Sequence, residues 1–157
     1  MRLLFLITIA LSILNASSFK ETRYISALDV EQYKSGTIQL NGELLTLTYK
    51  KPRYELLNYY NNRLTIESNN KTKELPYKEY PQLRFMSLSL RAILTDNYSS
   101  LTNLFDVEQT KNLVTLKAQS TINSLLNFIT ILTRENSTKV ITLYMRNQDK
   151  ITIETLK

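Results

Sequence analysis

Two pairs of carboxylates are the residues whose spacing could support acid–base chemistry. Asp29 and Glu31 lie close in the chain, as do Asp106 and Glu108, and paired carboxylates are the catalytic groups of many glycoside hydrolases. Alternation along a strand places both members of each pair on one face. Solvated charge on a strand surface is therefore the better interpretation of both pairs, and an enzyme is the least favoured function class.

The chain of 157 residues contains no histidine and no cysteine. It therefore lacks the commonest general base, the thiolate nucleophile and the usual ligands of zinc. Gly36 and Gly42 are its only glycines, so the sequence contains neither a glycine-rich phosphate loop nor a G-x-S-x-G nucleophile elbow. We expect no enzymatic activity, no cofactor and no metal site.

The net charge of +6 is spread along the sequence, with no run of four or more basic residues. A surface that binds nucleic acid usually concentrates its positive charge, so we expect no nucleic-acid partner. A mild positive excess assists encounters with anionic lipid head groups. A chance surplus of lysine explains the charge equally well.

The first residues have the layout of a secretory signal peptide. Met1 and Arg2 precede an apolar run that ends at Leu14, and small residues follow at Ala16 and Ser18. The run is shorter than the roughly 20 residues of a spanning helix, although an uncleaved anchor is the alternative. We expect cleavage near Ala16 to Ser18, and a single periplasmic domain over residues 19–157.

Short segments of alternating apolar and polar residues, closed by Asn, Gly, Asp or Lys clusters, predict antiparallel strands joined by turns. The expected strands cover residues 19–25, 37–40, 43–49, 54–59, 63–68, 72–75, 105–109, 113–118, 128–133, 140–145 and 151–156. Asn41 and Gly42 predict a hairpin turn, because both tolerate positive φ. Pro52 ends the pairing of the strand before it, since proline lacks an amide hydrogen.

One substantial helix is expected between Pro81 and Thr95, with a further helical turn over residues 99–104. Its apolar positions recur at helical spacing, at Leu83, Met86, Leu90 and Ile93 or Leu94. Its opposite side carries Arg84, Ser87 and Arg91. This pattern predicts an amphipathic helix that packs on a sheet.

The apolar positions of many strands can form one continuous face. A single helix covers only part of such a sheet, which leaves room for an apolar concavity that shelters an acyl chain. A closed core is the alternative, because periodicity does not distinguish a core from a lipid pocket. The candidate lipid-pocket residues are Leu45, Leu47, Tyr49, Leu64, Ile66, Leu83, Met86, Leu90, Ile129, Ile131, Ile141, Leu143, Ile151 and Ile153.

The order of these features resembles the LolA-type periplasmic lipoprotein carriers, in particular a divergent LolA-like branch, over most of the mature chain. In the first half, the resemblance rests on FKETRY at 19–24, GTIQL at 36–40, the step YKKP at 49–52 and the strand at 63–68. In the second half, it rests on LSLRAIL at 88–94, LTNLFDV at 101–107, residues 113–116 and the closing strand pair.

The resemblance implies an α+β fold, a strongly curved antiparallel sheet forming a half-open β-barrel with a helical lid over an apolar cavity. It also implies a carrier that takes an acylated lipoprotein or lipid from an inner-membrane exporter to an outer-membrane acceptor. We expect a monomer. One departure is Leu56, which stands where better-known carriers place an arginine that helps to hold the lid; Arg53 is the nearest substitute.

A second hypothesis is an interaction module of an envelope complex. Such a module would pair exposed strand edges with a partner and would use its interior only as a core. Bound lipid would favour the carrier, whereas a stable partner without lipid would favour the module.

Overall fold

A computed structural model describes residues 16–120 and 122–156. These residues form one antiparallel sheet, one α-helix and two short 3-10 helices. The strands are β1 (Ser17–Ile25), β2 (Val30–Asn41), β3 (Leu44–Lys51), β4 (Glu55–Tyr59), β5 (Arg63–Ser68), β6 (Lys71–Pro76), β7 (Phe105–Gln109), β8 (Leu113–Ala118), β9 (Leu126–Thr133), β10 (Lys139–Met145) and β11 (Lys150–Leu156). The helices are η1 (Ser26–Leu28), α1 (Pro81–Thr95) and η2 (Ser99–Leu101).

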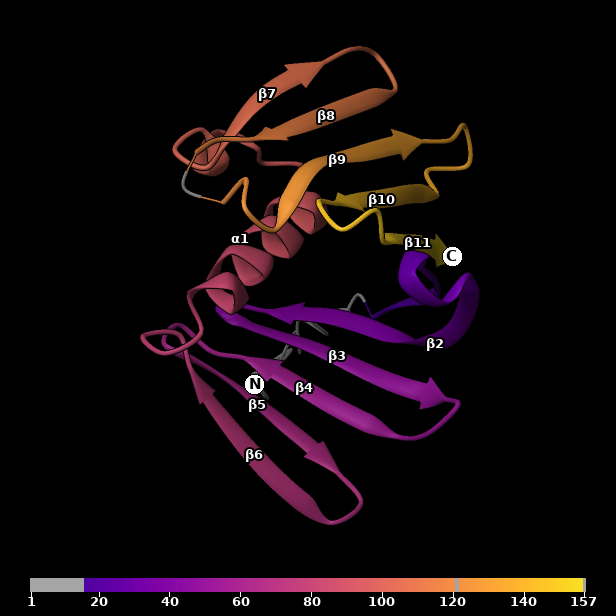
Figure 1. The fold of residues 1–157 in the computed structure, drawn as a ribbon, viewed down its shortest axis with the longest axis vertical. Coiled ribbons are helices and arrows are strands. Elements are labelled where there is room, and N and C mark those ends of the chain that lie inside the picture. Colours follow the sequence, from indigo (N-terminus) through magenta and orange to yellow (C-terminus); the bar gives the residue numbers. More distant parts are fainter. Residues whose placement is uncertain (1–15, 121, 157) are drawn as a thin grey trace, which may run out of the picture.

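The strand order is β6-β5-β4-β3-β2-β1-β11-β10-β9-β8-β7. The first and last strands of the chain meet at the centre of the sheet, where Glu21 of β1 pairs with Ile153 of β11. This pairing joins an N-terminal half, β1 to β6, to a C-terminal half, β7 to β11. Figure 1 shows the two halves bending around α1, which lies between β2–β3 and β9–β10.

The predicted half-open β-barrel with a helical lid is wrong. The sheet is open, because β6 and β7 stand at opposite ends of the strand order and do not pair. Its one α-helix packs into the core by one side, where Ser87, Ser89, Leu90, Ala92 and Ile93 are buried. Alternation shows which side chains face inward, but it does not show how far a sheet curls or whether its edges meet.

Most of the predicted elements are confirmed. The strands β5, β7 and β8 and the helix α1 have the predicted bounds, and Gly42 has the positive φ of 54° expected in the hairpin turn. The prediction missed the first half of β2, which begins at Val30 and pairs with β1. Residues 31–34 are mostly polar and give no alternating signal; backbone pairing with β1 makes them a strand.

Most of the predicted signal peptide, residues 1–15, lies outside the described residues. The two serines that follow Ala16 begin β1, where Ser17 pairs with Ile38 and Ser18 pairs with Leu156. In the part of the chain that the structure describes, no helix is long and apolar enough to cross a membrane.

The core consists of two hydrophobic clusters, one on each side of α1. The N-terminal cluster contains Phe19, Ile38, Leu45, Leu47, Tyr49, Tyr59, Leu64, Tyr77 and Leu90. The C-terminal cluster contains Ala92, Ile93, Tyr98, Leu101, Phe105, Val114, Leu116, Ile122, Ile129, Ile131, Ile141 and Leu143. Met86 of α1 and Ile153 of β11 pack against both clusters, so the two clusters meet beneath the helix.

The predicted polar side of α1 does not face solvent throughout. Arg84 is exposed, but Ser87 is buried. Arg91 donates from Nε to the Ser87 hydroxyl at 3.2 Å and from Nη2 to the Tyr59 carbonyl oxygen at 3.1 Å. The first bond lies within the helix, and the second ties the polar side of the helix to β4 in the N-terminal half of the sheet.

Candidate functional site

An apolar cavity of about 290 Å³ lies beside the first half of α1. The helix contributes Leu83 and Met86, and the strands β9 and β10 contribute Ile129 and Leu143. Half-exposed Leu125, in the turn before β9, also lines it. The walls are almost entirely carbon, because hydrophobic side chains of the helix and of the sheet face each other across this space.

A second cavity of about 180 Å³ adjoins the first, and we call it the mixed cavity. The residues that line both cavities are Tyr59, Met86, Ser89, Ile129 and Leu143. The mixed cavity is apolar where it meets the first cavity, and its far end is lined by charged residues, namely Glu21, Arg23, Lys34 and Glu55. Together the two cavities form a slot beneath α1, apolar at one end and charged at the other.

Ten of the fourteen predicted pocket residues line this slot. They are Leu47, Tyr49, Leu83, Met86, Leu90, Ile129, Ile141, Leu143, Ile151 and Ile153. The other four line neither cavity, because Leu45, Leu64 and Ile131 are fully buried in the core and Ile66 packs against the N-terminal cluster.

The sequence prediction missed the polar side chains of the slot. Ser89 lies one helical turn from Met86 and shares its side of the helix, but a serine gives no signal in a pattern of apolar positions. Glu21 and Arg23 alternate with outward-facing residues of β1 and lie on the same face as Phe19, which is buried. The period of two therefore assigns both charged residues to the inward face, whereas their charge favours exposure.

Glu21 is a buried carboxylate, with 2% of its surface exposed. It accepts a hydrogen bond from Arg23 Nη2 at 3.2 Å and another from the Tyr49 hydroxyl at 2.8 Å. Burial raises the pKa of Tyr49 above its ordinary value, and the nearby Glu21 charge adds to this effect. The Tyr49 phenol therefore remains protonated and available as a donor to Glu21.

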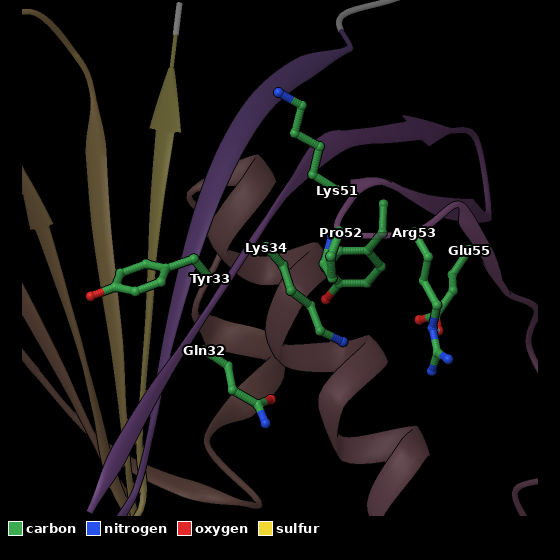
Figure 2. Close-up of a pocket in the computed structure, with 8 residues that line it drawn as sticks. Gln32, Tyr33, Lys34, Lys51, Pro52, Arg53 and Glu55 are labelled. Carbon is green, nitrogen blue, oxygen red and sulfur yellow. The ribbon is translucent and has the colours of Figure 1, made fainter.

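The charged end of the slot adjoins an open pocket of about 460 Å³. Figure 2 shows Lys34, Pro52, Arg53 and Glu55 around it. The Lys34 ammonium lies 4.8 Å from the centroid of the Tyr49 ring, a cation–π arrangement. Lys34, Tyr49 and Glu55 line both this pocket and the mixed cavity, so the slot leads to the surface through this opening, where three basic side chains, Lys34, Lys51 and Arg53, face one acid, Glu55.

Arg53, the nearest substitute for the lid arginine of better-known carriers, pairs with a residue of β4 and not with the helix. Its Nε donates to Glu55 at 2.8 Å, and its side chain is 70% exposed. The arginine that fixes the helix to the sheet is Arg91, which comes from α1 itself and reaches the Tyr59 carbonyl oxygen.

The carboxylate pairs lie outside the slot. Asp29 and Glu31 are exposed and accept hydrogen bonds from the phenols of Tyr24 and Tyr33. Asp106 accepts a bond from Gln119, and Glu108 pairs with Lys117 at the surface; these two carboxylates are also exposed. Within the described residues, no group of three or more Asp, Glu, His or Cys side chains is placed to hold a metal ion.

No protein-family model matches the chain, and no curated protein matches it either. The resemblance to LolA-type carriers therefore stays a prediction from the sequence. The geometry of the slot is the observation on which a functional conclusion rests.

Proposed function

We propose that the protein is a non-enzymatic carrier that shelters an acyl chain of a lipid or lipoprotein in the slot beneath α1. The apolar cavity of about 290 Å³ is the observation that carries this proposal. Ligand sites usually enclose about 300–1,000 Å³ behind mostly apolar walls. The apolar cavity and the mixed cavity adjoin, so together they provide space of this kind.

The lining suits a flexible hydrocarbon chain. Each methylene group removed from water contributes about 0.8 kcal/mol, so an acyl chain that crosses an aqueous space needs such a shelter. Met86 lies where the two cavities meet. Its unbranched side chain can repack around chains of different shapes, because it makes no directional demands.

Export to the periplasm is part of the proposal. There the carrier would receive its cargo from an inner-membrane exporter and deliver it to an outer-membrane acceptor, as the resemblance implies. Of the two cleavage points expected from the sequence, the one after Ala16 leaves β1 whole. Cleavage after Ser18 would remove two residues that pair with β2 and β11.

Native mass spectrometry with lipid extraction, on gently purified protein, tests the carrier directly. We expect a bound acylated molecule and uptake of a fluorescent acyl probe. Ser89→Phe should block the slot and weaken probe binding at least about tenfold, the equivalent of about 1.4 kcal/mol, because Ser89 is 4% exposed and faces both cavities.

Ser100→Phe is the matched control, since Ser100 is exposed and lies away from the slot on η2. Circular dichroism and thermal unfolding must show that both variants fold. Protein that carries no lipid and takes up no acyl probe would overturn the proposal. Undiminished probe binding in folded Ser89→Phe would show that the slot is not the binding site.

The interaction module is the second candidate, and the two unpaired sheet edges favour it. On β6 the exposed side chains include Lys71 and Lys73, whereas on β7 they include Asp106 and Glu108. Charges on an edge also protect it from pairing. Sedimentation analysis decides between these roles: a stable lipid-free complex that Lys73→Glu disrupts would favour the module.

A further inference from the structure

Two positive side chains lie at the charged end of the mixed cavity. Among the described residues, neither has an acceptor for every one of its hydrogen-bond donors. Arg23 uses Nη2 to bind Glu21, but its Nε is shielded from solvent and has no hydrogen-bond partner. A buried donor without an acceptor is uncommon in a folded protein and often marks a place for an absent group. Arg23 lines the mixed cavity and its side chain is 39% exposed, so an acceptor in the cavity can reach the guanidinium, although not its shielded Nε.

Lys34 is the second such group. Its ammonium lies over the Tyr49 ring and lines both the mixed cavity and the open pocket. Among the described residues it belongs to none of the ion pairs, in contrast to Arg53, which pairs with Glu55. Lys51 also lines the open pocket, which therefore has an excess of positive charge.

Glu21 and Glu55 balance the charges of Arg23 and Arg53, with which they pair, and Lys34 and Lys51 remain as the excess positive charge. One Glu21 oxygen accepts from Arg23 and the other from the Tyr49 hydroxyl. Glu21 also holds the Arg23 guanidinium at the end of the slot. A guanidinium fixed in this way keeps further N–H groups for a planar or tetrahedral anion.

We propose that Arg23 and Lys34 bind the anionic head group, a carboxylate or a phosphate, of a single-chain amphiphile whose tail lies beneath α1. This inference rests on the proposed carrier function and narrows its cargo. The apolar and mixed cavities, of about 290 and 180 Å³, suit one acyl chain better than several. The charged groups lie at one end of the slot, as an amphiphile with one head and one tail requires.

Binding of parinaric acid, a fluorescent fatty acid, and of its uncharged methyl ester tests the head-group contact. The two molecules have the same tail, so the ratio of their dissociation constants isolates the charge. We expect the acid to bind at least about tenfold more tightly than the ester. Lysophosphatidate should likewise displace the acid better than monoacylglycerol does. Inorganic phosphate alone should not displace it.

The variant Lys34→Gln should reduce the preference for the acid several-fold and leave the affinity for the ester unchanged. Arg23→Gln should do the same; if it fails to fold because Glu21 loses its partner, Lys34→Gln still provides the test. Lys20→Gln is the matched control. Lys20 belongs to the same strand as Arg23, but it is exposed and alternates to the outer face.

The outcomes separate this inference from the carrier function. If acid and ester bind equally, or if folded Lys34→Gln and Arg23→Gln both keep the full preference, the head-group site is overturned and the carrier stands. If neither molecule binds, both proposals fail. If phosphate alone displaces the acid, the site binds a free anion, and the proposal that its ligand is an amphiphile is overturned.

Discussion

The two hydrophobic clusters beside α1 differ in the polar groups that they enclose. The N-terminal cluster includes Tyr49, Tyr59 and Tyr77 and packs near the buried carboxylate of Glu21. The C-terminal cluster includes one tyrosine, Tyr98, and its other members are aliphatic side chains and a phenylalanine. The polar groups therefore lie in the half of the core where the slot reaches its charged opening.

The difference arises from single positions on otherwise similar strands. The inward positions of β10 are apolar at Ile141, Leu143 and Met145, and Lys139, at the start of the same face, extends to the Ile93 carbonyl oxygen and Asp96 at the end of α1. The inward positions of β1 change from apolar to charged along the strand, from Phe19 to Glu21 and Arg23. In the slot, β10 thus contributes only apolar side chains, whereas β1 contributes charged ones.

The largest expected effect compares a leucine from each cluster. Leu116 is completely buried in the C-terminal cluster, whereas Leu47 lines the mixed cavity. Leu116→Ala should lower the free energy of unfolding by about 2–5 kcal/mol. Leu47→Ala should cost clearly less, because a side chain that borders empty space has fewer contacts to lose.

Denaturant titration of both variants measures this difference. The acyl probe should still bind folded Leu116→Ala, since Leu116 itself lines neither cavity and only its strand neighbour Ile129 does. Equal losses of stability in the two variants would mean that the surroundings of Leu47 are packed as closely as the C-terminal cluster. The two clusters would then not differ in packing.

A smaller effect is expected from the buried carboxylate. Glu21→Gln preserves shape but removes the charged acceptor that Arg23 and Tyr49 share, so we expect a loss of about 1–3 kcal/mol in the free energy of unfolding. Glu154→Gln is the matched control. Glu154 forms a surface ion pair with Arg134 at 2.6 Å, and such pairs contribute about 0–1 kcal/mol.

Equilibrium unfolding at neutral pH measures the loss of stability in both variants. A similar, small loss in the two would show that the Glu21 cluster contributes no more than a surface pair. The contrast between a polar and an apolar half of the core would then have no energetic counterpart.

The sequence predicts the elements of this fold better than their assembly. Alternation, the Asn41-Gly42 turn and the spacing of Leu83, Met86 and Leu90 are local signals, and they place most strands and the helix correctly. The openness of the sheet depends on whether β6 and β7 meet. No local pattern encodes that distance, so the half-open barrel was an error that residue spacing alone could not correct.

The candidate site was predictable in its apolar part only. Residues such as Ile141 and Ile153 follow from the period of two, which gives the inward face without separating a cavity wall from a closed core. Leu45 and Ile131 share that period and lie in the closed core. Glu21 and Arg23 could have been placed inside by the same period, but their charge predicts exposure, and only their contacts explain why they are inside.

The smallest expected effect concerns the tyrosines of the N-terminal cluster at alkaline pH. Burial raises the pKa of Tyr59 to about 12, and the negative charges of ionised Tyr77 and of Glu21 act in the same direction. In the unfolded chain, a tyrosine titrates near its ordinary value of about 10. The folded state therefore holds this proton more tightly. Its contribution to stability is complete below pH 10 and is lost as the pH rises from about 10 towards about 12.

Replacement of this phenol should make the folded protein less sensitive to base. Near pH 11, the wild type should have lost on the order of 1 kcal/mol of stability through Tyr59 alone, and Tyr59→Phe should retain that amount. Tyr54→Phe is the control, because Tyr54 is 58% exposed. Denaturant titrations at several pH values from neutral to alkaline measure the slope. Parallel curves for the wild type and Tyr59→Phe would show that this phenol is not buried in solution. The N-terminal cluster would then be open to water around Tyr59, where the two cavities meet.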